Sequence, residues 1–266
     1  MRLFLIGDSF TENLFDSEYQ TPSNDAVHIY IEHLKTKQKS KALWFTDWLE
    51  LWGYEIYNFG IRGCSIEQMY YQFAKIDTEF REGDRIIVGW TTPSRHNIYD
   101  ENGEIHSIVS EPTFIENISV QEFLIQQRIN REFSMYNNGY IIKNVLPFME
   151  YLINNHSKYK PIVWSPFENI SKLICKFKYY FYSPMDIELN KLLPVNKLRI
   201  IDDLPESNDR HYNIYGNYYL AIIMKHLLQN TKSEYYINDS NIIHNIINEI
   251  NTTPDIQLNN VFLHYP

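Results

Sequence analysis

A serine stands directly after the first predicted strand, where a nucleophile can be presented. The chain opens with an apolar run that ends in Gly7-Asp8-Ser9-Phe10. A Ser at a turn from a strand into a helix projects its hydroxyl at the carboxyl edge of the sheet, and a helix N-terminus favours negative charge on nearby oxygens. The same residues are typical of an ordinary helix cap, in which Asp8 or Ser9 accepts a backbone N–H. Ser9 is therefore a candidate nucleophile, with capping as the alternative.

Two further segments carry the groups that a serine nucleophile needs. The segment from Asn58 to Ser65 follows another predicted strand, and its glycines, Gly60 and Gly63, permit a tight turn whose N–H groups face one edge. Late in the chain, Asp209-Arg210-His211 combines a His suited to accept a hydroxyl proton with an acid that can fix its tautomer. Taken alone, the first segment is also typical of a simple turn and the second of a surface pair.

Short apolar runs with β-branched residues alternate with longer helix-like stretches, a pattern typical of a parallel sheet covered on both faces. Ligands of such α/β sheets bind at the carboxyl ends of the strands. We therefore expect the three segments to meet at that edge of a mostly parallel, five-stranded sheet. The predicted strands are Arg2–Ile6, Glu55–Phe59, Arg85–Gly89, Pro161–Trp164 and Leu198–Ile201.

Apolar residues spaced three and four apart predict the helices. Residues 94–160 are long for a crossover and form either a lid over the site or extra helices that widen the core. Residues 1–229 are predicted to form one domain, and the polar, Asn-rich residues 230–266 an appendage. The predicted helices are 26–52 with a break at 35–41, 66–80, 120–133, 141–153, 214–228 and a weak patch at 242–250, with a turn at 100–104.

The composition argues against several classes of protein. A length of 266 residues allows one large domain, at roughly 100–200 residues per domain. Lys and Arg number 24 against 33 Asp and Glu, so the net charge of −9 provides no positive field for nucleic acid or an anionic membrane. No apolar run reaches the ~20 residues that span a bilayer, and the first run is too short for a secretory signal. We expect a cytoplasmic protein, although a virion protein or export without a signal peptide leaves the same pattern.

Metal, redox and nucleotide chemistry leave no signature in the sequence. The two cysteines, Cys64 and Cys175, have no metal-binding or redox spacing, and Cys64 is expected to be a small buried hydrophobe rather than a reactive thiol. The nine His residues lack the spacings of zinc sites, and no phosphate-binding loop of the GxxxxGK type is present. We therefore expect no cofactor and no metal.

In order and placement, the three segments resemble the sequence blocks of the SGNH (GDSL-type) hydrolase family. The resemblance runs from residue 3 to about residue 225, and the last block usually places its acid and His three residues apart and sometimes two. It implies a three-layer α/β/α sandwich of the flavodoxin-like kind, in which Ser9 is the nucleophile, His211 the general base and Asp209 its orienting acid. It also implies oxyanion donors at the backbone N–H groups of Ser9 and Gly63, with Asp8 beside them.

The family's third block, normally Gly-x-Asn-Asp, differs in this chain. The predicted strand at 85–89 is followed by Trp90 and Thr91, so Thr91 stands where the family's Asn donates a hydrogen bond to the oxyanion. Either the shorter Thr91 hydroxyl takes this role, or the following loop supplies Ser94, Arg95 or Asn97. The strength of the oxyanion hole depends on which of these holds.

The acid that pairs with the His and the role of two aromatic residues each have more than one interpretation. Asp203 and Glu206 lie close to Asp209 in the sequence and are alternative acids for the His. Trp90 and Tyr212 either flank an acyl pocket or belong to the core, where large aromatic residues at strand ends are more common.

These features predict a serine esterase that removes an acetyl or other short acyl group from a carbohydrate or other small molecule. An acyltransferase with the same triad is a close variant, because exclusion of water from the acyl-enzyme would redirect the acyl group to another alcohol. A non-catalytic binding or structural module on the same fold is the alternative from a different class, and Thr91 is its main support. Neither nucleic acid nor a membrane is expected as a partner.

Overall fold

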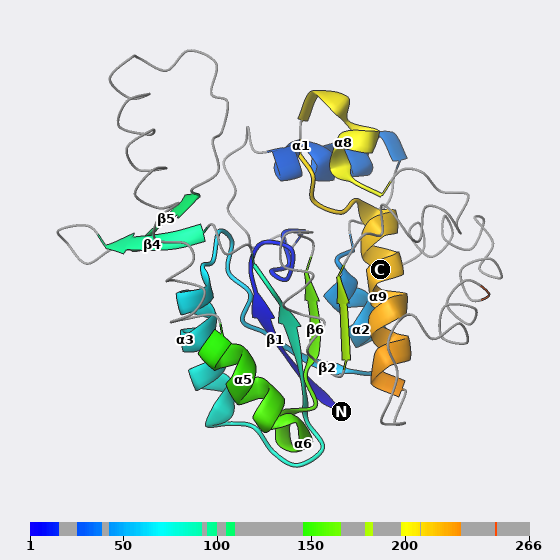
Figure 1. Ribbon diagram of the computed structural model, residues 1–266. Coiled ribbons are helices and arrows are strands. Elements are labelled where there is room, and N and C mark those ends of the chain that lie inside the picture. Colours follow the sequence, from blue (N-terminus) through cyan, green and yellow to red (C-terminus); the bar gives the residue numbers. More distant parts are fainter. Residues whose placement is uncertain are drawn as a thin grey trace.

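The core of the protein is a parallel β-sheet with helices on both faces, an α/β fold (Figure 1). The computed structural model describes residues 1–15, 26–38, 43–91, 95–99, 105–109, 146–165, 179–182, 198–207, 209–229 and 248. The strand order is β2-β1-β3-β6-β7, and every neighbouring pair in it is parallel. The strands are β1 (Arg2–Gly7), β2 (Glu55–Asn58), β3 (Arg85–Gly89), β6 (Ile162–Ser165) and β7 (Tyr179–Tyr182).

The first strand shows why this sheet needs helices on both faces. Its side chains alternate between the faces, so Leu3 and Leu5 pack into one core cluster while Phe4 and Ile6 pack into a second. All four side chains are completely buried. A strand that is apolar on both faces is typical of a central strand in a parallel sheet.

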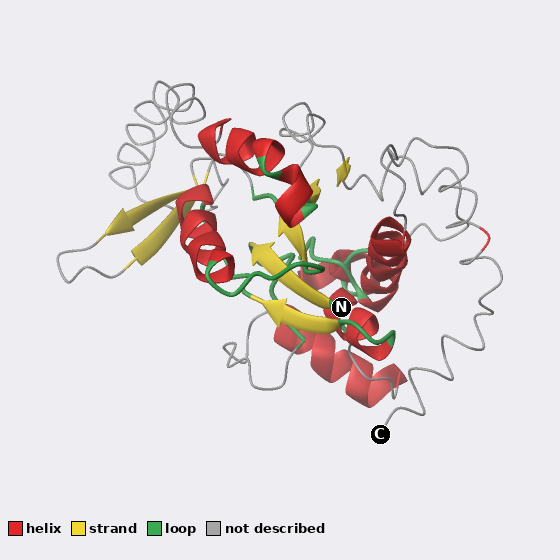
Figure 2. Ribbon diagram, turned by 90° about the horizontal axis from the view of Figure 1, so that it is seen from below, coloured by secondary structure: helices red, strands yellow, loops and turns green. Residues whose placement is uncertain are grey.

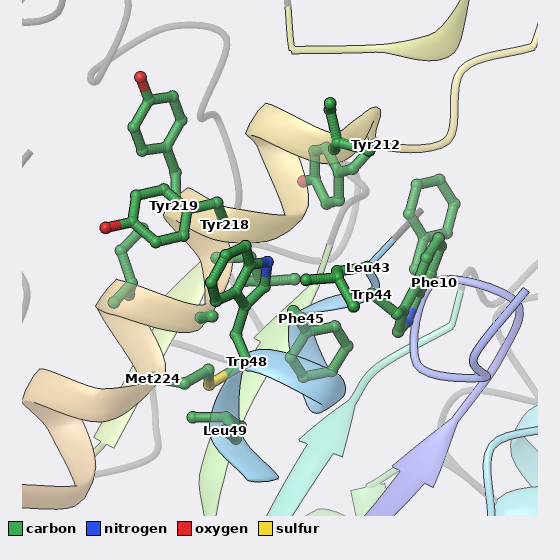
Figure 3. Close-up of a cluster of buried hydrophobic side chains, with 14 of the residues drawn as sticks. Phe10, Leu43, Trp44, Phe45, Trp48, Leu49, Tyr212, Tyr218, Tyr219 and Met224 are labelled. Carbon is green, nitrogen blue, oxygen red and sulfur yellow. The ribbon is translucent and has the colours of Figure 1, made fainter. Parts of the chain in front are cut away.

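Two helical layers cover these faces. The layer over Leu3 and Leu5 contains α2 (Phe45–Leu51) and α9 (Ile214–Gln229), whose aromatic contact is shown in Figure 3, with ring centroids of Trp48 and Tyr218 4.9 Å apart. The other layer contains α3 (Ile66–Asp77), α5 (Leu146–Asn154) and α6 (His156–Tyr159). Figure 2, turned by 90°, shows the strands running between helices on both sides.

The remaining helices lie beyond the carboxyl ends of the strands, at the top of Figure 1. They are α1 (Ala26–His33), which continues into a π-helical turn at Leu34–Gln38, and α8 (Ile200–Asp203), which is followed by a 3-10 helix at Pro205–Ser207. The predicted break in the helix over 26–52 therefore corresponds to the end of α1, the π-helical turn and the start of α2. No helix among the described residues is both long enough and apolar enough to cross a membrane.

The prediction of a strand at 198–201 is wrong. The run begins α8 at Ile200, and only Arg199 makes an isolated antiparallel bridge, to Tyr212. The cause is Asp202, whose carboxylate accepts hydrogen bonds from the backbone N–H groups of Leu198 and Arg199 at 3.0 and 2.8 Å and caps the helix. The strand beside β6 is instead β7, which the sequence pattern missed.

The predicted insertion at 94–160 contains a second sheet. Strands β4 (Arg95–Tyr99) and β5 (Ile105–Val109) pair antiparallel, and the predicted turn at 100–104, which lies outside the described residues, separates them in sequence. The helix predicted at 141–153 corresponds to α5, whereas the one at 120–133 lies outside the described residues. The appendage at 230–266 also lies outside them except for Asn248.

Candidate active site

Ser9 lies in a tight turn at the carboxyl end of β1. The carbonyl of Asp8 accepts hydrogen bonds from the N–H groups of Thr11 and Glu12, at 2.8 and 2.9 Å, and its carboxylate accepts one from Phe10 N–H at 3.0 Å. The expected helix does not follow, because residues 11–15 form turns and bends. Asp8 is completely buried, and its carboxylate stabilises this turn by accepting a backbone N–H, as in the capping alternative but without a following helix.

The Ser9 hydroxyl, the His211 ring and the Asp209 carboxylate form a continuous chain of hydrogen bonds. Ser9 Oγ lies 2.9 Å from Nε2 of His211, and Nδ1 of His211 lies 2.7 Å from Oδ1 of Asp209. With the proton on Nδ1, the ring donates to Asp209 and Nε2 accepts from the serine hydroxyl. Residues 202 positions apart in the sequence thus meet in the order expected for a nucleophile, a base and an acid.

The Asp209 carboxylate is stabilised in its charged form. Burial opposes ionisation, but hydrogen bonds from the ring and backbone of His211, together with the charges of His211 and Arg62, outweigh burial and hold the pKa of Asp209 below its usual value. An ionised carboxylate next to Nδ1 is the arrangement that stabilises an imidazolium when Nε2 accepts a proton. The His211 side chain remains 17% exposed, so solvent reaches the ring at this edge.

The alternative acids make other contacts. Asp203 accepts hydrogen bonds from the Tyr30 hydroxyl at 2.9 Å and from Asn213 Nδ2 at 3.0 Å. Glu206 is exposed on the 3-10 helix. Asp209 is therefore the residue that pairs with His211.

Several contacts hold the loop that carries His211. The carbonyl of His211 accepts from Ile200 N–H at 2.9 Å, and that of Asp209 accepts from Ile201 N–H at 2.8 Å. The guanidinium of Arg199 donates to the Arg210 carbonyl at 2.7 Å and stacks 4.4 Å from the centre of the Tyr212 ring. The start of α8, predicted as a strand, therefore holds the loop that carries His211.

Phe10 ties the nucleophile turn to the same loop. Its ring centroid lies 4.6 Å from that of His211 and 5.7 Å from that of Tyr212. Figure 3 shows Phe10 and Tyr212 at the edge of the aromatic cluster beside α9. The residue after Ser9 therefore packs against the His211 ring and restricts the orientation of the imidazole.

The segment from Asn58 to Ser65 forms a turn next to the nucleophile turn. Gly63 has a φ of 71°, and Cys64 N–H donates to the Ile61 carbonyl at 3.0 Å, as in a β-turn whose third residue needs positive φ. Asn58 joins the two turns, because its Nδ2 donates to the Thr11 carbonyl at 2.8 Å and its Oδ1 accepts from Gly60 N–H at 2.9 Å.

The contact between these turns requires a glycine at position 60. A Cβ atom there would lie 2.6 Å from the backbone nitrogen of Glu12 and 2.9 Å from the carbonyl carbon of Thr11. Neither backbone atom can move without shifting the turn that carries Ser9. The predicted oxyanion segment thus packs directly against the nucleophile turn.

Thr91 is completely buried just beyond the carboxyl end of β3, the strand next to β1. This is the edge of the sheet at which Ser9 lies. Of the alternative donors, Ser94 lies outside the described residues, and Arg95 and Asn97 belong to β4, with side chains outside them as well.

Trp90, Tyr212 and Cys64 are all completely buried. The Trp90 ring stacks on Phe148, at a centroid distance of 5.8 Å, inside the core layer of α3 and α5. Trp90 and Tyr212 therefore match the core alternative rather than an acyl pocket. Cys64 is a buried thiol, consistent with the expected hydrophobe.

Gln72 belongs to the site's surroundings and was missed by the sequence analysis. It lies on α3 among the buried residues Met69, Phe73 and Ile76 and is itself only 2% exposed. A Gln on the apolar face of a helix was the available signal, since a buried amide requires hydrogen-bond partners.

The described residues contain no cluster of three or more His, Cys, Asp or Glu side chains that could hold a metal ion. Comparison with known proteins yields no relative, since no protein-family model, curated protein or solved structure matches the chain. The function of the site is therefore inferred from its geometry.

Proposed function

We propose that the protein is a serine ester hydrolase of the SGNH type, with Ser9, His211 and Asp209 as its triad. The observation that carries the proposal is the hydrogen-bonded chain from Ser9 Oγ through both ring nitrogens of His211 to Asp209 Oδ1. Its position at the carboxyl edge of a parallel sheet supports the same proposal, as does the strand order β2-β1-β3-β6-β7, which fits a flavodoxin-like sandwich.

In the first half of the reaction, Ser9 Oγ attacks the ester carbonyl while Nε2 of His211 takes the hydroxyl proton. Asp209 stabilises the imidazolium that forms. The negative charge on the carbonyl oxygen is stabilised by the backbone N–H groups of Ser9 and Gly63 and by the Thr91 hydroxyl. Collapse of the tetrahedral intermediate breaks the ester C–O bond, and His211 returns its proton to the departing alcohol.

In the second half, water attacks the acyl-Ser9 carbonyl. His211 takes a proton from the water and then gives it to Ser9 Oγ as the acid leaves. The substrate that we propose is an acetyl or other short acyl ester of a carbohydrate or small molecule. An acyltransferase would share every step up to the acyl-enzyme and differ only in the attacking alcohol.

The test is covalent labelling with a fluorophosphonate, which reacts with an activated serine hydroxyl, followed by intact-mass measurement and peptide mapping. We expect one label per chain, on Ser9, and none in Ser9→Ala. Ser157→Ala, which removes an exposed serine on α6, is the matched control and should label like the wild type. Folded wild-type protein that takes up no label would contradict the proposal and favour a non-catalytic module.

Activity on p-nitrophenyl acetate gives a second measurement. Ser9→Ala should lower kcat by at least ~10³-fold, as expected when a triad nucleophile is removed. Adding a candidate acceptor alcohol and analysing the products separates hydrolysis from acyl transfer.

A further inference from the structure

We propose that Gln72 is a positioning residue that holds the Ser9 turn and the Gly63 turn in register with each other. The proposal rests on the function proposed above. The buried amide of Gln72 contacts both segments at once: its Oε1 accepts from Gly7 N–H at 2.9 Å, and its Nε2 donates to the Gly7 carbonyl at 3.2 Å. The same Nε2 lies 3.3 Å from Sγ of Cys64, the residue after Gly63.

Gln72 forms its hydrogen bonds to Gly7 just beyond the point where the residue pairing of β1 with β2 ends. The pairing of β1 with β2 stops at Leu5 and Asn58, whereas β1 continues alongside β3 to Gly7 and Gly89. Beyond Leu5, the side-chain amide of Gln72 pairs with both backbone groups of Gly7 as a peptide group of a neighbouring strand would. The end of β1 is thereby fixed two residues before Ser9.

The segment that carries Gly63 is attached at the same point. The Gly7 carbonyl accepts from Ile61 N–H at 3.0 Å as well as from Gln72, and Ile61 opens the turn that contains Gly63. Gln72 also holds Cys64 at the other end of this turn. The turn that carries the proposed oxyanion donor is therefore attached to the end of β1 at both of its ends, directly through the Gly7 carbonyl at Ile61 and through Gln72 at Cys64.

Loss of this amide should misplace reacting groups rather than remove them. A displacement of about 1 Å between a nucleophile and its oxyanion donors is enough to cost on the order of 10²-fold in rate. Substrate that is bound before reaction is less sensitive to such a shift. The signature of a positioning role is thus a fall in kcat with little change in KM.

The test compares Gln72→Met with Ile76→Ala. Met keeps the length of the side chain and removes both hydrogen bonds to Gly7, whereas Ile76→Ala opens a cavity one turn further along α3, at a residue that is also completely buried. On p-nitrophenyl acetate, Gln72→Met should lose on the order of 10²-fold in kcat, with KM within a few-fold of wild type. Its rate of fluorophosphonate labelling at Ser9 should fall in parallel. Ile76→Ala should lower Tm but keep wild-type kcat per folded molecule.

A second variant keeps the proposal testable if Gln72→Met does not fold. Gln72→Glu retains an acceptor for Gly7 N–H in either protonation state, so its kcat should lie between those of wild type and the Met variant. Wild-type kcat and labelling in folded Gln72→Met, with only Tm reduced, would show a purely structural role and overturn this inference alone. A wild-type protein that neither labels nor hydrolyses the ester would overturn the proposed function and this inference together.

Discussion

Oδ1 of Asp209 lies 2.7 Å from both the backbone nitrogen and the ring Nδ1 of His211. A single carboxylate oxygen thus fixes the chain and the ring of the same residue. This double contact explains how an acid only two positions before the His can serve it. The chain turns tightly enough at Arg210 for the carboxylate to fold back onto the following backbone N–H, and this turn brings Oδ1 to the ring.

The first prediction concerns this acid. Asp209→Asn keeps the shape of the side chain, but its amide favours the wrong tautomer of the ring, so kcat should fall on the order of 10⁴-fold. Asp203→Asn is the matched control, because Asp203 bonds to Tyr30 and Asn213 instead of the ring. Steady-state hydrolysis of p-nitrophenyl acetate by folded protein measures both. Equal losses in the two variants would remove Asp209 from the triad.

The second prediction concerns stability against pH. The pKa of Asp209 is below its usual value of 3.8 in the folded protein, so its ionised form stabilises the fold above about pH 4. This contribution disappears as pH falls through the lower folded pKa. Thermal unfolding from pH 7 to pH 3 should therefore show the Tm difference between wild type and Asp209→Asn shrinking at the acid end.

Asp203 should show the opposite dependence of stability on pH in the same experiment. Burial raises the pKa of Asp203, against the effect of its hydrogen bonds, so its ionisation costs stability as pH rises. The Tm of Asp203→Asn should thus improve relative to wild type between pH 3 and pH 7, while that of Asp209→Asn worsens. Parallel trends in both variants would contradict the assignment.

The third prediction tests the contact between the two turns. A Cβ at position 60 would meet backbone atoms of Glu12 and Thr11 at 2.6 and 2.9 Å, so Gly60→Ala must displace the Ser9 turn. We expect a stability loss of about 1–3 kcal/mol and a fall in kcat on the order of 10²-fold.

Gly53→Ala is the matched control for Gly60→Ala. Gly53 has a φ of 89°, and a Cβ added there would have no atom within 4 Å, so an Ala is strained but meets no neighbour and lies outside the site. It should lose stability without losing kcat. Urea unfolding and ester hydrolysis distinguish the two, and a fully active Gly60→Ala would show that the turns can separate without consequence.

Features that depend on a few neighbouring residues could be predicted from the sequence, whereas contacts between distant segments could not. Four predicted strands were found because short runs rich in apolar and β-branched residues, bounded by turn residues, favour the strands of a parallel sheet. The run at 198–201 has a similar composition, but Asp202 caps its backbone, and the run begins a helix instead of a strand. Ser9, Asp209 and His211 could be identified as candidate site residues from the sequence because each belongs to a short motif. Gln72 could not be identified, and Gly60 was interpreted only as a turn glycine, since the importance of both lies in contacts between turns that are distant in sequence.

The last prediction turns on Thr91, which is completely buried beyond β3. If its hydroxyl donates to the oxyanion, Thr91→Val, which keeps the shape and deletes the donor, should raise the barrier by roughly 2.7–4 kcal/mol, the scale for losing one such donor. KM should change little, because the oxyanion forms only after substrate is bound. The second variant, Thr91→Asn, introduces the amide that SGNH hydrolases normally have at this position. In this buried position the larger side chain should cost about 1–3 kcal/mol of stability through overpacking.

Both Thr91 variants are to be measured on one ester, with Tm recorded so that kcat refers to folded protein. A loss in Thr91→Val without a gain in Thr91→Asn identifies the hydroxyl as a working donor, since the site is then already built around the shorter side chain. A gain in Thr91→Asn with no loss in Thr91→Val means that the backbone N–H groups of Ser9 and Gly63 carry the oxyanion alone and that an added amide completes it. Unchanged kcat in both, beside an inactive Ser9→Ala, would remove Thr91 from the site, because a donor that contacts the oxyanion cannot be deleted without raising the barrier.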